Sequence, residues 1–213
     1  MKFKWLHQQN NASDIIVFFS GWGFTSEVVA HLKPSSNTDV LFVQDYSTLD
    51  GKMPDLQHYK KRHLVAWSFG VANFITWSEQ NSSVIFDTHT AINGTPLAID
   101  QKMGIAKRVV QQTIDNFSAD NYQAFLNRCG GSNSSFTTSD VILTALKNEL
   151  NIINQREYSA SNNINWDKVI VSQQDVIFPV NNQQRAWHKS SYQLIDAPHN
   201  PFDIWSDWQD LLA

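Results

Sequence analysis

The residues with the clearest chemical potential surround one serine, in the stretch Leu64-Val65-Ala66-Trp67-Ser68-Phe69-Gly70-Val71. An apolar run ends at Ser68 and helical spacing begins directly after it, which predicts a strand, a sharp turn and a helix. Small residues, Ala66 and Gly70, stand two positions before and after the serine, as the crowded turn called a nucleophile elbow requires. Such a turn exposes the serine hydroxyl beside a helix N-terminus. The pattern favours a nucleophile, although a serine that only caps a helix would look the same.

A serine nucleophile needs a base and a group that orients the base, and both have candidates later in the chain. His199 follows the last predicted strand, in a turn between Pro198 and Pro201, and Asp175 follows the strand before it. The order Ser68, Asp175, His199 is the one expected for an α/β-hydrolase. We therefore predict that His199 is the general base and that Asp175 orients its ring.

Other residues could fill these two roles. His89 is expected near the end of a strand beside the elbow and is the alternative base. Asp45 and Asp87 are also expected near strand ends and are the alternative acids. We prefer His199 because the topology of this fold puts the base after the last strand.

Backbone N–H groups are expected to stabilise the oxyanion that forms when the serine attacks. The N–H of Phe69, directly after the nucleophile, is one predicted donor. The second is the N–H of Trp22, in the loop Gly21-Trp22-Gly23 that follows an apolar run. This loop does not resemble a dinucleotide-binding turn, because it lacks the third glycine and has a bulky residue between the first two.

Apolar runs that alternate with helical patterns must position these residues, and they favour an α/β fold with a mostly parallel sheet covered on both faces. Strands are predicted at 3–8, 15–19, 39–43, 63–67, 84–93, 168–172 and 192–195. Helices are predicted at 27–32, 56–60, 69–79, 109–117, 122–128, 139–151 and 181–189, and over 202–212. Ligands bind at the carboxyl ends of such strands. We expect a single α/β-hydrolase domain, 1–213, with residues 97–165 inserted as a helical lid.

Composition excludes several classes of function. A net charge of -4 argues against a generally basic nucleic-acid binder, and no stretch reaches the length of a membrane span. The single cysteine, Cys129, cannot form an internal disulfide, and no Cys/His spacing suits zinc. The N-terminus lacks the apolar segment of a secretory leader. We expect a cytoplasmic monomer without a metal or a cofactor.

Four stretches of the chain together resemble the pimeloyl-acyl-carrier-protein methyl ester esterases of biotin synthesis, of the compact BioG type. They are Phe19-Ser20-Gly21-Trp22-Gly23, Leu64 to Val71, Ala91-Ile92-Asn93-Gly94-Thr95-Pro96 and Ala197-Pro198-His199-Asn200-Pro201-Phe202. The resemblance implies hydrolysis of the methyl ester of pimeloyl-acyl-carrier protein, with methanol as the second product. It also implies catalytic roles for Ser68, Asp175 and His199. The chain departs from commoner hydrolases at Ser20, where many relatives have histidine, and at Ala66.

This substrate would require an apolar slot for the acyl chain and a basic face for the acidic carrier protein. The residues expected to line the slot are Trp22, Phe69, Phe117, Phe125 and Leu126. The residues expected to dock the carrier are Lys107, Arg108 and Arg128. Ordinary core packing and a solvated helix face would explain the same residues.

Two other functions stay open on the sequence. The same fold and the same three residues would suit an acyl thioesterase or a general short-chain carboxylesterase. A hydrolase scaffold without activity could also serve as a binding module.

Overall fold

The computed structural model describes residues 1–9, 11–131, 139–159 and 164–212. The strands are β1 (Lys2–His7), β2 (Asp14–Phe19), β3 (Thr38–Gln44), β4 (Lys61–Trp67), β5 (Thr88–Ile92), β6 (Lys168–Ser172) and β7 (Gln193–Ile195). They form one sheet in the order β1-β3-β2-β4-β5-β6-β7. The pair β1 and β3 is antiparallel and the other five pairs are parallel. The predicted mostly parallel sheet is confirmed.

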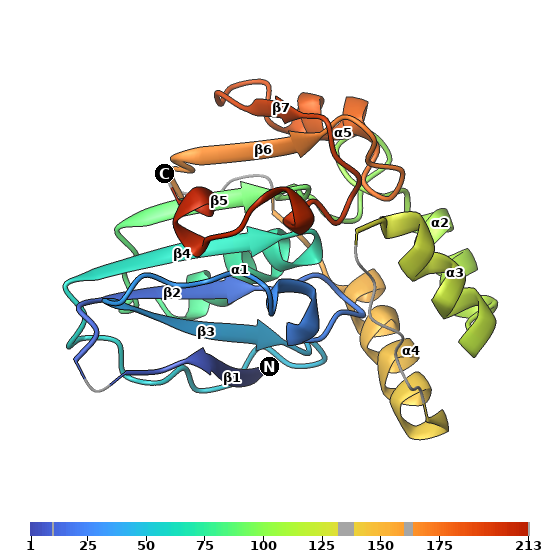
Figure 1. The fold of residues 1–213 in the computed structure, drawn as a ribbon. Helices are drawn as coiled ribbons and strands as arrows, with labels where there is room; N and C mark the ends of the chain where they lie inside the picture. Colours follow the sequence, from blue (N-terminus) through green and yellow to red (C-terminus); the bar gives the residue numbers. More distant parts are fainter. Residues whose placement is uncertain (10, 132–138, 160–163, 213) are drawn as a thin grey trace.

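Helices pack behind this sheet and extend beyond the carboxyl ends of its parallel strands (Figure 1). They are α1 (Phe69–Gln80), α2 (Lys107–Asp115), α3 (Ala119–Cys129), α4 (Asp140–Gln155) and α5 (Val180–Ala186). Three 3₁₀ turns complete the fold: η1 (Ser26–Val29), η2 (Phe202–Ile204) and η3 (Trp208–Leu211). In Figure 1, α1 lies behind the sheet and the C-terminal turns lie in front of it.

Two neighbouring phenylalanines of β2 explain why the central strands are apolar throughout. Phe19 packs edge-on against Phe74 of α1, with ring centroids 5.2 Å apart. Phe18 points to the other face, where its ring centroid lies 5.5 Å from those of both Phe202 and Trp208. Because α1 covers one face and the C-terminal segment covers the other, successive residues of the strand are all buried.

The C-terminal segment differs from the single helix predicted over 202–212. It forms two 3₁₀ turns, η2 and η3, that are separated by extended residues. Lys33 causes the break: its N–H donates to the carbonyl of Ser206, and its own carbonyl accepts from the N–H of Trp208, both at 3.0 Å. This bridge to a distant loop replaces the bonds of a continuous helix.

Three other predicted elements are also corrected. The helix predicted over 27–32 is the single 3₁₀ turn η1, and residues 56–60 contain only a turn. The strand predicted over 84–93 is β5, which begins at Thr88, because pairing with β4 begins at His63 opposite that residue.

The helices α2, α3 and α4 follow β5 in the chain and precede β6. Figure 1 shows them beyond the carboxyl ends of the parallel strands. They belong to the predicted insertion 97–165, of which residues 132–138 and 160–163 lie outside the described residues. None of the helices in the described ranges is both long and apolar enough to cross a membrane.

Buried polar contacts attach α4 to the end of the sheet. Glu149 is 7% exposed, and its Oε1 accepts a hydrogen bond of 2.8 Å from the N–H of Tyr46. The indole N–H of Trp22 donates to the carbonyl of Leu146 at 3.0 Å. Arg156, directly after α4, donates to the carbonyl of Tyr46 at 2.7 Å. Burial of the Glu149 carboxyl is the main cause that raises its pKa to about 7.

The pKa of Glu149 makes the free energy of unfolding depend on pH. The folded protein holds this proton more tightly than the unfolded chain, whose pKa is near 4.5. The resulting stabilisation is fully present below the unfolded value and is lost as the pH rises through about 7. We expect Glu149→Gln to remove this pH dependence, which amounts to at most on the order of 3 kcal/mol.

Urea unfolding of the wild type and of Glu149→Gln at about pH 5 and about pH 8 measures the effect. The difference in unfolding free energy between the two proteins should change between these conditions. A difference that is the same at both pH values would contradict the role given to Glu149.

Candidate active site

Ser68 lies at the junction of β4 and α1 in a conformation that residues other than glycine rarely adopt, with φ 59° and ψ -128°. Its N–H donates to the carbonyl of Ile92 at 2.9 Å, which holds the turn against β5. At Gly70, a Cβ atom would lie 2.2 Å from the carbonyl oxygen of Phe19 and 2.7 Å from that of Ser20. The predicted strand, turn and helix are therefore present, and glycine at position 70 lets the end of β2 approach α1.

The structure brings Asp175 and His199 together with Ser68, although the histidine and the serine are 131 residues apart. The Nε2 atom of His199 lies 2.9 Å from the Oγ of Ser68, and its Nδ1 atom lies 2.8 Å from the Oδ2 of Asp175. All three residues are buried. When Nδ1 carries the proton and donates a hydrogen bond to the carboxylate, Nε2 is free to accept a hydrogen bond from the serine hydroxyl.

The carboxylate of Asp175 is held by three further donors. Its Oδ1 accepts from the N–H groups of Ile177 at 2.8 Å and Phe178 at 2.9 Å. Its Oδ2, which faces His199, also accepts from the side chain of Gln183 on α5 at 2.9 Å. These contacts orient the carboxylate toward the imidazole ring. The sequence analysis did not identify Gln183. Its only local signal is that it is a polar residue early in the helix that follows Asp175.

Asn93 holds the loop that carries His199. It is fully buried, and its side-chain amide donates to the carbonyl of His199 at 2.9 Å and to the Oγ of Ser172 at 2.7 Å. Its Oδ1 accepts from the N–H of Ser172 at 2.7 Å, and the indole of Trp67 donates to the same carbonyl of His199 at 2.9 Å. The ends of β4, β5 and β6 thus share one polar anchor, which the sequence pattern did not reveal.

The two predicted backbone donors come from segments next to Ser68: Phe69 follows it in the chain, and Trp22 follows Gly21. Gly21 packs against the serine, because a Cβ built at this glycine would lie 3.1 Å from the Cβ of Ser68. Within the described ranges, the N–H groups of Trp22 and Phe69 have no hydrogen-bond partner. Neither group therefore has an internal acceptor among the described residues.

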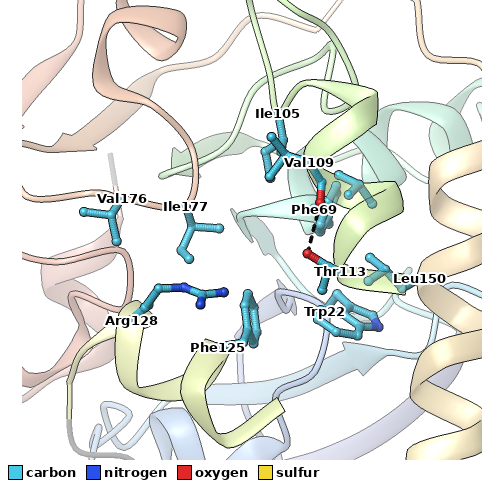
Figure 2. A pocket seen from close by; sticks show the side chains of 11 residues that line it. Trp22, Phe69, Ile105, Val109, Thr113, Phe125, Arg128, Leu150, Val176 and Ile177 are labelled. Atoms are coloured by element: carbon cyan, nitrogen blue, oxygen red, sulfur yellow. Dashed lines mark hydrogen bonds between the residues drawn. The ribbon is translucent and has the colours of Figure 1, made fainter. Parts of the chain in front are cut away.

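A cavity of about 190 Å³ lies between the inserted helices and Trp22 and Phe69, which carry the two predicted backbone donors (Figure 2). Of the predicted slot residues, Trp22, Phe69 and Phe125 line it. Phe117 lies outside it and packs on Trp22, with ring centroids 5.8 Å apart, and Leu126 is fully buried in the core. The lining residues not predicted from the sequence are Ile105, Val109, Val110, Thr113, Leu150, Val176 and Ile177.

The three predicted docking residues occupy α2 and α3. Arg128, on the last turn of α3, also lines the cavity, and Figure 2 shows its guanidinium turned toward it. Lys107 and Arg108 are exposed on the first turn of α2, next to the lining residue Val109. Among the described residues, none of the three cations has a hydrogen-bond or ion-pair partner.

The alternative residues have other partners. Nδ1 of His89 lies 3.7 Å from Asp167, and Asp45 forms an ion pair of 2.9 Å with Lys2. Asp87 accepts from the N–H of Arg62 at 2.7 Å. Across the described part of the chain, no group of three or more His, Cys, Asp or Glu side chains could hold a metal ion.

Comparisons with known sequences give a family and a longer relative. A family model described as pimeloyl-ACP methyl esterase BioG matches residues 1–211. The chain is also 33% identical over 199 residues to a malonyl-[acyl-carrier protein] O-methyltransferase of Bacteroides fragilis. That match covers 87% of this chain and 39% of the relative, so the chain spans well under half of the relative's length.

Solved structures confirm the α/β-hydrolase fold. The crystal structure of BioG from Haemophilus influenzae is similar with a TM-score of 0.88 and 28% identity, and the match covers 100% of both chains. An α/β hydrolase from a Medee basin deep-sea metagenome library has a TM-score of 0.64 over 93% of this chain and 86% of its own. At 12% identity, the second likeness concerns the fold alone.

The close approach at Gly70 predicts a cost for any side chain there. We expect Gly70→Ala to lower the free energy of unfolding by about 1–3 kcal/mol, because the new methyl group would collide with backbone atoms that cannot rotate away. The exposed Glu79→Ala on the same helix is the control and should stay within about 0.5 kcal/mol of the wild type. Chemical unfolding of the three proteins is the measurement, and equal stability of the two variants would refute the packing argument.

Proposed function

Since the chain belongs to the BioG family of pimeloyl-ACP methyl esterases, we propose that it hydrolyses the methyl ester of pimeloyl-acyl-carrier protein in biotin synthesis. The products are methanol and pimeloyl-acyl-carrier protein. The observation that carries the proposal is the hydrogen-bonded chain of Ser68, His199 and Asp175, with distances of 2.9 and 2.8 Å. It lies beside a cavity with mainly apolar walls, in a chain of this family.

The reaction proceeds through an acyl-enzyme. Ser68 Oγ attacks the carbonyl carbon of the methyl ester while His199 Nε2 takes the hydroxyl proton, and Asp175 stabilises the imidazolium. The N–H groups of Trp22 and Phe69 donate to the oxyanion, and each such donor contributes roughly 10²–10³ in turnover. The imidazolium then protonates the leaving methoxide, which departs as methanol. A water molecule, deprotonated by His199, attacks the acyl carbon, and the carboxylic acid leaves as the serine regains its proton.

The cavity beside Ser68 would hold the acyl chain. Trp22, Phe69 and Phe125 offer apolar surface near the nucleophile, and residues of α2 and α4 complete the walls. The inserted helices thus act as a lid that shields the ester from bulk water. Ser68 is only 4% exposed, which supports this role because excluding bulk water strengthens the electrostatic interactions inside a site.

The acidic carrier would dock on the cationic side of the lid. A protein of net charge -4 needs a local basic surface to attract an acidic partner. Lys107, Arg108 and Arg128 supply three cations without partners among the described residues, and Arg128 stands at the cavity itself. The carrier would then present its acyl chain directly to the slot.

Growth without biotin tests the proposed reaction in a cell. A bacterium that lacks its own pimeloyl-acyl-carrier-protein methyl ester esterase should grow without biotin when it expresses this protein. It should not grow with Ser68→Ala, because this variant has no nucleophile.

The purified protein should also release methanol from the carrier-linked methyl ester. Hydrolysis of the thioester to the carrier in preference to the methyl ester would instead assign a thioesterase.

Charge reversal tests the docking surface. We expect Lys107→Glu with Arg108→Glu to raise KM for the carrier-linked ester by about tenfold or more, because two attractive charges become repulsive. Hydrolysis of p-nitrophenyl butyrate, which has no carrier, should stay within about twofold of the wild type. Lys60→Glu with Lys61→Glu is the matched control, since these exposed lysines stand at the start of β4, at the end of the parallel strands opposite the site.

Equal losses on both substrates, or equal losses in the two double variants, would refute docking at α2. Arg128→Glu is measured separately, because this residue also lines the cavity and can affect both substrates.

A further inference from the structure

Tyr46 connects the end of β3 to the loop that carries the proposed oxyanion donor Trp22. Its side chain is 1% exposed, and its hydroxyl donates to the carbonyl of Ser20 at 2.7 Å. The ring lies parallel to that of Phe19, with centroids 6.4 Å apart and an interplanar angle of 9°. Two consecutive residues at the end of β2 therefore contact one buried tyrosine.

The Ser20 carbonyl belongs to the peptide group that begins the loop Gly21-Trp22-Gly23. Because a peptide group is planar, a hydrogen bond to this carbonyl fixes the orientation of the whole unit. Only the dihedral angles of Gly21 then separate the fixed unit from the peptide that contains the Trp22 N–H. Glycine has more conformational freedom than any other residue, so the direction of this N–H depends on the contacts that hold the two peptide groups. One of them is local, since the Oγ of Ser20 donates to the carbonyl of Gly21 at 3.3 Å, and the bond from Tyr46 holds the other peptide group.

The backbone of Tyr46 is itself held from the side of the insertion. Its N–H donates to the Oε1 of Glu149 at 2.8 Å, and its carbonyl accepts from Arg156 at 2.7 Å. Asp45, the preceding residue, has a positive φ of 63°, a conformation that is unfavourable without such support. The position of Tyr46 is therefore set by α4 and the residue that follows it.

Arg156 also supports the second proposed oxyanion donor. Its other terminal nitrogen donates to the Oδ1 of Asn73 on α1. The amide of Asn73 in turn donates to the carbonyl of Phe69 at 2.8 Å, within the first turn of α1. One guanidinium therefore joins the segments that support the N–H groups of Trp22 and Phe69.

We propose that Tyr46 is a positioning residue for the oxyanion hole, held in place by Glu149 and Arg156 of the inserted segment. This inference rests on the proposed function of Ser68 and its neighbours. The tyrosine does not touch the substrate and acts through the Ser20 carbonyl. The insertion consequently has a second role besides forming the cavity wall, because it sets the geometry of the backbone donors.

Tyr46→Phe removes the hydroxyl and keeps the ring. Loss of an oxyanion donor costs roughly 10²–10³ in turnover, and a misplaced donor retains part of this effect. We expect kcat for p-nitrophenyl butyrate to fall by about tenfold, with KM within about twofold, because the donor acts in the transition state rather than on bound substrate. The affinity for a trifluoromethyl ketone, which forms an oxyanion when Ser68 adds to it, should fall by a similar factor.

Tyr59→Phe is the matched control. The hydroxyl of Tyr59 donates to the Oδ2 of Asp39 at 2.6 Å, and both residues are buried. Asp39 lies near the start of β3, at the end of the parallel strands opposite the site. This variant therefore also loses a buried hydrogen bond from a tyrosine hydroxyl, here to a carboxylate, and its kcat should stay within about twofold of the wild type.

A second variant tests the inserted segment. Arg156→Lys keeps the positive charge but lacks the planar fork that reaches Tyr46 and Asn73 together, and it should lower kcat in the same direction as Tyr46→Phe. Circular dichroism verifies that each variant is folded. A kcat within twofold of the wild type in folded Tyr46→Phe, or an equal loss in Tyr59→Phe, would overturn the proposal. If Tyr46→Phe does not fold, an unchanged kcat in folded Arg156→Lys overturns it.

The experiment separates this inference from the proposed function. Ser68→Ala is assayed on the same ester. If its activity equals that of the wild type, the proposed function of Ser68 fails. If Ser68→Ala is inactive and Tyr46→Phe retains full kcat, only the role of Tyr46 fails.

Discussion

The left-handed backbone of Ser68 is the constraint on which the rest of the site depends. A non-glycine residue at φ 59° has a conformation that costs free energy, so contacts with the surrounding structure must stabilise it. Here the serine N–H bonds to the carbonyl of Ile92, and Gly70 lets the backbone of Phe19 and Ser20 press against the start of α1. The strained turn raises the hydroxyl above the strand ends, where it meets the imidazole of His199.

Polar groups near the strand ends hold His199 and Asp175 in place beside this turn. Asn93 and Trp67 hold the carbonyl of His199, and Gln183 holds the carboxylate of Asp175. Nearly all of these groups are buried, so each missing bond would leave an unsatisfied polar atom. The network therefore restricts the ring of His199 more strictly than a single contact with Ser68 would.

The inserted helices are part of the same arrangement rather than a separate cover. The carbonyl of Leu146 accepts from Trp22, while Glu149 and Arg156 hold the backbone of Tyr46. Part of the cavity wall and several supports of the loop after β2 thus come from one segment.

The sequence by itself determined the class of fold, the elbow at Ser68 and the order of the three residues around it. These features follow from local rules: continuous apolar runs belong to doubly covered strands, and small residues are needed around a sharp turn. Only the tertiary structure decided that contacts with Lys33 divide residues 202–212 into two turns and that Phe117 lies outside the cavity. It also decided that Asn93, Gln183 and Tyr46 support the site. Such contacts join residues far apart in the chain, and their partners depend on how whole elements pack, which no local pattern of residue types encodes.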